Sequence, residues 1–457
     1  MPGTAARKSS FIISLLLGGC ALTLVVGIVR SPEEAFRASL GGLGIWWQTV
    51  FPGLLPPLML AELLAASGLL HGVAALGSPL MRRLFRLPPA AGWVAALGWT
   101  AGVPAGARET ARLRDRGLIR GRDAESLLVL SHMPNPFLVI VVVGSGFLQA
   151  PVYGWTIAAG LWLSGIAAGI IWPRLSGRAP APEQADAPAV RTRPQAELPG
   201  RPGDAAAAPG ADANATDAAD VRSGGPDDLW LPDRLQGAPL RRAYRAIQEA
   251  RSADQRPFGK QIADAVTHAV ATLFAIGGLM MMSAVLLRIV QTVLPGTDAW
   301  LTIPSLYEMH LGAYAAGRSA LFEAAPAKAA ALIAAALAWS GVSGLLQARA
   351  AWSGGGRFPW PPFIAGRLLH AALALLCTYP LALAAQRGWL SGLTPVWQAL
   401  AGPAASSVPA AGPLPTGWAL LPGTTLAALA SLAIFVLLSL LAALISPRRR
   451  GSGKRPK

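Results

Sequence analysis

Residues 126–148 read SLLVLSHMPNPFLVIVVVGSGFL, an apolar run long enough to cross a bilayer as a helix. The run is interrupted near its middle by S-H-M-P-N-P at positions 131–136. Two prolines within three residues prevent continuous helical hydrogen bonding, because each lacks a backbone N–H. Ser131, His132 and Asn135 then offer donors and acceptors where the helix opens. A simple kink needs only one proline, so the pattern favours a binding role over a purely structural one.

The composition points to a membrane protein rather than an ordinary soluble enzyme. Of 457 residues, 53% are hydrophobic and 14% charged, against about 25% charged in an average soluble domain. The net charge of +16 could suggest nucleic-acid binding. Basic residues also collect in the cytoplasmic loops of membrane proteins, however. Both cysteines, Cys20 and Cys377, lie inside apolar runs, which excludes a disulfide framework or a cysteine-based zinc site.

Long apolar runs predict an all-α polytopic protein with about eight transmembrane helices. The predicted spans lie near 11–29, 46–70, 126–148, 152–172, 262–287, 327–346, 364–385 and 419–445. Two further apolar segments, 90–106 and 300–320, are short and broken by Gly, Pro or charge. We expect them to be re-entrant.

The distribution of arginine and lysine supports this topology. Arginines precede the 90–106 segment and follow it closely, so both of its ends are predicted to be cytoplasmic. Eight spans return the chain to its starting side, and both termini are basic, which places both in the cytoplasm. The segment 288–326 is then outside. The two halves mirror one another, as in the inverted repeats of secondary transporters, where broken helices meet near the bilayer midplane.

This pattern divides the chain into four parts. Residues 1–173 form a first membrane half and 258–447 a second, followed by a basic cytoplasmic tail at 448–457. Residues 174–257 are rich in Ala, Pro, Asp, Gly and Arg, which predicts a disordered cytoplasmic linker. Its basic and acidic side chains are equal in number, so the +16 comes from the membrane halves and the termini. An alternative for the linker's end, 238–256, is an amphipathic helix on the membrane surface.

Polar groups inside apolar segments are the remaining site candidates, because they are costly in a membrane unless paired or hydrated. Each has a structural alternative: a turn out of the membrane for the glycines and proline, a loop in water for the Glu-His pair, and plain helix packing for the serines. Glu62 could pair with an arginine or line a pathway, whereas Arg367 and His370 are expected to reach the interface or to pair locally. The candidates for binding a solute are Gly102, Pro104, Gly106, Ser131, His132, Asn135, Pro136, Glu308, Ser340 and Ser343, and those for a coupling ion or proton are Glu62, Glu308 and His310.

Motifs for catalysis are absent from the sequence. It has no G-x-x-x-x-G-K-[ST], H-E-x-x-H or G-x-S-x-G, and its five histidines lack metal-ligand spacing. We therefore expect neither an enzyme nor a protein with a resident cofactor or metal.

Four motifs together resemble the sporulation integral membrane proteins of endospore-forming bacteria. They are W-W-Q-T-V-F-P-G-L-L-P at 46–56, G-V-P-A-G-A-R at 102–108, S-H-M-P-N-P at 131–136 and P-F-I-A-G-R-L-L-H at 362–370. That family carries paired nucleoside-recognition, or Gate, domains and is distantly similar to concentrative nucleoside transporters. The chain departs from the pattern at His132, where Asn is expected.

The resemblance implies a multi-pass protein of the bacterial plasma membrane that acts in formation of the spore cortex or envelope. It also implies two re-entrant hairpins whose tips meet unwound helices around a substrate site. We expect a protein that moves a small polar solute, nucleoside-like in the family's terms, driven by sodium or protons. The partners are thus the solute and the lipid bilayer, with no nucleic acid, and a homo-oligomer is left open. The alternative is a membrane scaffold of sporulation that does not transport.

Overall fold

The structure is a computed structural model, and it describes residues 21–176, 239–293, 303–352 and 357–388, together with positions 15, 18 and 19. These residues form helices and connecting turns, and no strand occurs among them. Five helical stretches are long and apolar enough to cross a membrane: Pro32–Ala66, Pro151–Leu175, Phe258–Thr292, Pro326–Ala351 and Trp360–Gln386. The prediction of an all-α polytopic membrane protein is confirmed.

These five stretches overlap the predicted spans 46–70, 152–172, 262–287, 327–346 and 364–385. The span predicted at 126–148 is divided into two shorter helices, because the chain is non-helical at 132–135. The span predicted at 11–29 is described only in part, by the helix Ala21–Arg30. The span predicted at 419–445 lies outside the described residues.

The two halves of the chain contain the same parts in the same order: a long helix, a short hairpin, a broken helix and a second long helix. The first half comprises α2 (Pro32–Ile45), the π-helix η1 (Trp46–Val50), α3 (Phe51–Ala66), α4 (Leu69–Arg83), α5 (Ala91–Ala101), α6 (Ala105–Asp115), α7 (Gly121–Ser131), the π-helix η2 (Leu138–Phe147) and α8 (Pro151–Leu175). The second comprises α9 (Pro239–Ala253), α10 (Phe258–Val293), α11 (Pro304–Tyr307), α12 (Met309–Gly317), α13 (Ala320–Ala324), α14 (Pro326–Trp339), α15 (Gly341–Ala351) and α16 (Trp360–Gln386).

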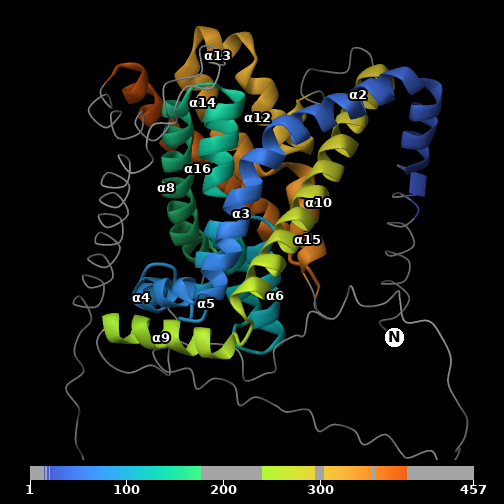
Figure 1. The fold of residues 1–457 in the computed structure, drawn as a ribbon. Helices are drawn as coiled ribbons and strands as arrows, with labels where there is room; N and C mark the ends of the chain where they lie inside the picture. Colours follow the sequence, from blue (N-terminus) through green and yellow to red (C-terminus); the bar gives the residue numbers. More distant parts are fainter. Residues whose placement is uncertain are drawn as a thin grey trace, which may run out of the picture.

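The hairpins of the two halves approach the middle of the bundle from opposite ends (Figure 1). The α5–α6 hairpin lies toward the end that carries α9, whereas α12 and α13 lie toward the other end. This is the arrangement that an inverted repeat requires. The predicted re-entrant segment 90–106 covers only the first limb of its hairpin, because the arginine-rich residues after it continue as α6.

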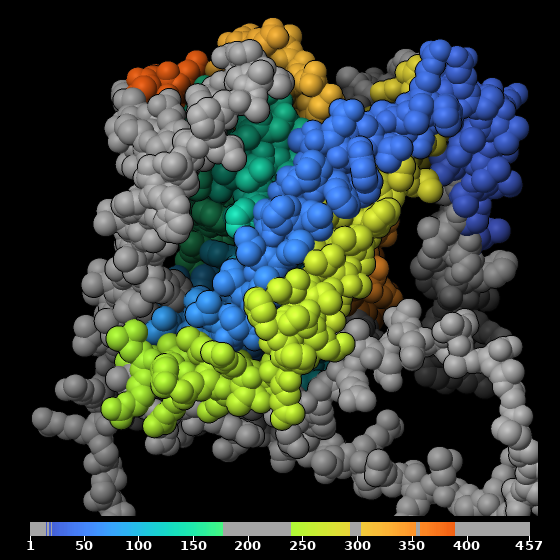
Figure 2. All heavy atoms as spheres, viewed as in Figure 1, coloured from blue at the N-terminus to red at the C-terminus, as the bar shows by residue number. Residues whose placement is uncertain are grey.

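Small residues allow the long helices of the two halves to approach closely. The Trp46 indole Nε1 donates to the carbonyl of Leu273 at 2.9 Å, and its ring lies against Gly277, where a Cβ would come within 2.6 Å of it. Figure 2 shows the blue α3 and the yellow-green α10 lying side by side on the front of the molecule. Alanines of α14, including Ala330 and Ala334, are fully buried. Such small-residue contacts are typical of helices that associate within a membrane.

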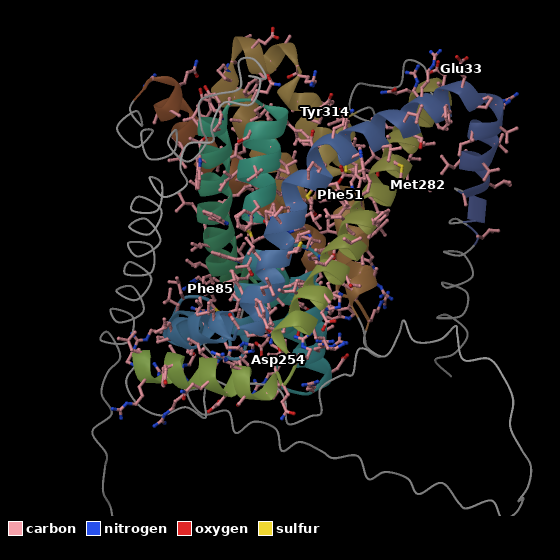
Figure 3. All side chains as sticks on the ribbon, in the orientation of Figure 1. Glu33, Phe51, Phe85, Asp254, Met282 and Tyr314 are labelled. Carbon is pink, nitrogen blue, oxygen red and sulfur yellow. The ribbon has the colours of Figure 1, made fainter. Side chains whose placement is uncertain are left out.

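The end of the predicted linker is helical, as the alternative for residues 238–256 predicted. Helix α9 buries Ala243 and Ala246, and its Ile247 lies against Gly68 and Gly72 around α4. Figure 3 places Asp254 beside α9, at the opposite end of the molecule from Glu33. The Arg256 side chain bridges Asp254 and Asp264 at 2.8 Å each, which fixes the corner from α9 into α10 and holds the pKa of Asp254 below its usual value. Residues 177–238 of the predicted linker lie outside the described residues.

Candidate functional site

The tip of the α5–α6 hairpin packs directly on the break that follows α7. A Cβ on Gly98 would lie 2.2 Å from the Ser131 carbonyl oxygen, and a Cβ on Gly106 would lie 2.7 Å from Ser131 Oγ. Gly102 at the tip has φ +77° and faces Asn135. Only glycine fits these approaches, so the G-V-P-A-G motif sets the distance between hairpin and break.

Asn135 joins the break to this hairpin and also starts the next helix. Its Nδ2 donates to the Thr100 carbonyl at 2.9 Å, and its Oδ1 accepts from the backbone N–H of Phe137 at 2.8 Å. An Asn that accepts from the backbone two residues on, with Pro136 at the first helical position, is a regular helix start. Both residues are therefore accounted for by local folding, in addition to any role in binding.

The end of α7 is held by an arginine from the other half of the chain. Arg367 of α16 is fully buried, and its guanidinium donates to the carbonyls of His132 and, at 3.2 Å, Val129. The same group contacts His370 Nδ1 at 2.9 Å, and His370 Nε2 lies 3.2 Å from the Leu161 carbonyl. A cation at the carboxyl end of a helix is favoured by the exposed carbonyls there. Of the two alternatives expected for Arg367 and His370, the structure has local pairing.

The second hairpin turns at Glu308, whose carboxylate is 1% exposed and makes two contacts. Oε2 accepts from the backbone N–H of Leu311 at 2.8 Å and so caps α12, while Oε1 lies 2.5 Å from His310 Nδ1. The other ring nitrogen of His310, Nε2, is buried with no hydrogen-bond partner among the described residues. The tip packs on the second break, because a Cβ on Gly341 would lie 2.8 Å from the Tyr307 carbonyl. The alternative of a loop in water is excluded for Glu308 and His310.

The two breaks meet at one hydrogen bond between the halves. His132 Nε2 lies 3.0 Å from Ser340 Oγ, and both residues are buried. Ser340 ends α14 with φ +70°. Ser131 and Ser343 flank this pair, and each hydroxyl is buried without a partner among the described residues.

Both hairpin tips and the first break also line one cavity. It is bounded by the long helices α3 and α10 at its sides, and most of its wall is apolar. The lining residues are Leu54, Leu58, Ala101, Gly102, Val103, Pro134, Asn135, Leu138, Thr272, Ile276, Met309 and His310. Broken helices and hairpin tips around a mainly apolar cavity with a few polar groups are typical of a solute site.

The structure brings most of the predicted site residues together, with Glu62 as the exception. Glu62 lies on α3 with its side chain 38% exposed, and its carboxylate is 3.9 Å from His268 Nδ1 of α10. Neither residue lines the cavity. Within the described residues, no three His, Cys, Asp or Glu side chains gather as a metal-ligand set. Sequence reasoning missed the part that Arg367 and Thr100 play. A charge within the first third of a long apolar helix was the available signal for Arg367.

A search among curated proteins finds a similar chain. Sporulation integral membrane protein YlbJ of Bacillus subtilis (strain 168) is 31% identical over 287 residues, which are 62% of this chain and 58% of that protein. The match supports a sporulation integral membrane protein family. It spans less than two thirds of the relative's length. No protein-family model matches the chain, and no solved structure matches it. Nucleoside recognition and a Gate domain therefore stay predictions.

Proposed function

We propose that the protein is a secondary transporter that moves a small polar solute across the bacterial plasma membrane by alternating access. One observation carries this proposal: both hairpin tips and the first helix break line the same cavity. An arrangement of this kind places the solute between two halves that can rock or gate against each other. The hydrogen bond between His132 and Ser340 joins the two breaks and would have to adjust in such a motion.

The cellular role proposed is sporulation, and it rests on the similar protein's printed name. A sporulating cell must supply its spore envelope or cortex across a membrane, which a solute transporter in the plasma membrane could serve. The predicted cytoplasmic position of both termini and the coupling to sodium or protons belong to the same proposal. Glu308 and His310, at the tip of the second hairpin, are the groups proposed for coupling.

Uptake by purified protein in liposomes tests this function. We expect accumulation of a nucleoside or nucleobase under an inward proton or sodium gradient, above the level in empty liposomes. Ala101→Leu places three extra carbons at the cavity wall, so it should abolish uptake. Ala275→Leu, on an exposed part of α10, is the matched control and should retain it.

A lack of uptake for every solute under both gradients would contradict the proposal. The scaffold alternative makes a different prediction, because a scaffold does not need its cavity open. If the protein is a scaffold, the Ala101→Leu variant and the unchanged protein should support spore formation equally well when both are equally abundant in the membrane.

A further inference from the structure

Helices α4 and α9 form a pair at one end of the molecule, beside the ends of two membrane-spanning stretches. Only Ser67 and Gly68 separate the stretch Pro32–Ala66 from α4, and only residues 254–257 separate α9 from the stretch Phe258–Thr292. Figure 1 shows α9 running across the end of the bundle, and Figure 2 shows it at the molecular surface. The pair therefore lies at the depth where these spans reach the membrane surface.

The two helices of the pair pack in antiparallel directions. Gly68, just before α4, faces Ile247 and Ala250 of α9. Gly72, one turn later, faces Ile247 again and Ala243, which is earlier in α9. A Cβ on Gly72 would lie 2.8 Å from the Ile247 side chain, so the glycines set the distance between the helices. This close contact fixes which side of each helix stays uncovered.

An apolar strip runs along one uncovered side of the pair. On α4, Leu69 directly follows the contact residue Gly68. On α9, Tyr244 directly follows the contact residue Ala243. Each is therefore turned by about 100° from the contact in the same sense, which in antiparallel helices is the same side of the pair. The members of this strip and their exposed fractions are Leu69 (46%), Val73 (36%), Leu240 (66%) and Tyr244 (60%).

Arginines lie at both ends of the apolar strip. Arg83 comes about four turns after Leu69, and Arg251 about two turns after Tyr244, so each lies on the same side of its helix as the strip. The Arg83 Nη1 atom is buried and has no hydrogen-bond partner among the described residues. A guanidinium only donates, so this atom lacks an acceptor. Helix α4 has no acidic residue, and the one acid of α9, Glu249, lies on the side of α9 away from the strip.

We propose that the α4–α9 pair binds anionic phospholipids of the leaflet at this end of the molecule. The apolar strip enters the boundary between acyl chains and headgroups, and Arg83 and Arg251 donate to headgroup phosphates. Amphipathic helices bind membrane surfaces through buried apolar area and through attraction of basic residues to anionic lipids. This inference does not depend on the proposed transport.

Lipid titration tests the role of the arginines. Purified full-length protein in detergent is titrated with phosphatidylglycerol in mixed micelles, and its thermal unfolding midpoint is recorded. Half-maximal stabilisation should need about fivefold more of this lipid in Arg83→Gln or Arg251→Gln and about 25-fold more in the double variant, the effect expected of one basic residue at a membrane surface and of two. Arg349→Gln, at an exposed site on α15, is the matched control and should bind like the unchanged protein.

Fluorescence quenching tests the position of the apolar strip. In a chain with Cys20 and Cys377 replaced by Ser, a bimane label is attached to Tyr244→Cys or to Glu249→Cys, both exposed positions of α9. The protein is placed in vesicles of phosphatidylglycerol and phosphatidylcholine whose acyl chains are brominated. We expect loss of fluorescence at position 244 and little change at position 249.

Four results would overturn this inference. Equal stabilisation by phosphatidylcholine would show that the lipid's charge is not recognised. Equal stabilisation by inorganic phosphate would assign the arginines to a soluble ion. A shift in Arg349→Gln as large as in Arg83→Gln would show an effect of net charge alone. Equal quenching at positions 244 and 249, or none at 244, would show that the strip does not enter the membrane.

Discussion

Arg367 shows how a single residue can hold a discontinuous helix in place. Its guanidinium satisfies carbonyls of Val129 and His132 that the end of α7 leaves without helical partners. Arg367→Gln should lower the thermal unfolding midpoint markedly, because each buried carbonyl left unsatisfied costs about 1–3 kcal/mol. Arg367→Lys should be intermediate, since an ammonium lacks the planar fork of donors. Arg349→Gln, at an exposed site on α15, is the control. Equal midpoints for Arg367→Gln and this control would contradict the assignment.

Ser340 allows the bond between the two breaks to be measured. Its hydroxyl meets His132 Nε2, and its backbone has the left-handed φ of +70°. Ser340→Ala removes the hydroxyl and keeps the strained backbone, whereas Ser340→Gly removes the hydroxyl and relieves the strain. We expect Ser340→Ala to destabilise the protein more than Ser340→Gly. In a double-mutant cycle with His132→Leu, the coupling should be about 0.5–3 kcal/mol. Additive effects would show that the bond contributes nothing.

Among the elements, the α5–α6 hairpin depends most on the absence of side chains. A Cβ at Gly98 would lie 2.2 Å from a backbone oxygen that cannot move away easily. Gly98→Ala should therefore cost about 1–3 kcal/mol through overpacking and reduce uptake as the hairpin shifts. Gly278→Ala is the matched control in α10, where a Cβ meets nothing within 4 Å. There the gain in helix propensity should be neutral or stabilising by up to about 1 kcal/mol. Equal stability of the two variants, measured by thermal unfolding in detergent, would rule out the close packing.

The same elements show what sequence reasoning can and cannot provide. Long apolar runs predict the long helices because bilayer thickness fixes their length. The proline pair at 134 and 136 predicts the break in the 126–148 run. The second helix of the hairpin, α6, was not predicted. Its arginines are typical of a cytoplasmic loop, and the sequence alone does not show that they belong to a hairpin. The burial of Arg367 was missed for a related reason: the sequence does not specify which face of α16 meets α7.

At the scale of the whole molecule, the inverted order of parts relates the charge pattern to the cavity. Arginine-rich α9 and the α5–α6 hairpin lie toward one end, and α12 and α13 lie toward the other (Figure 1). The excess of basic residues predicts that the α9 end faces the cytoplasm. The charge pattern of the sequence was sufficient to predict that the two hairpins lie toward opposite ends of the molecule. It was not sufficient for the position of Glu62, which requires the packing of α3 on α10.

Cysteine labelling tests this orientation directly. In a chain with Cys20 and Cys377 replaced by Ser, we would introduce Ser252→Cys at the end of α9 or Ala324→Cys at the end of α13, both exposed positions. A membrane-impermeant maleimide should label position 324 in intact cells and position 252 only after permeabilisation. The reverse result would show that the α9 end faces outward, which would contradict the orientation assigned from the basic residues. It would still be consistent with an inverted repeat. Labelling of both positions from the same side would contradict the inverted repeat itself, because α9 and α13 would then share one face of the membrane.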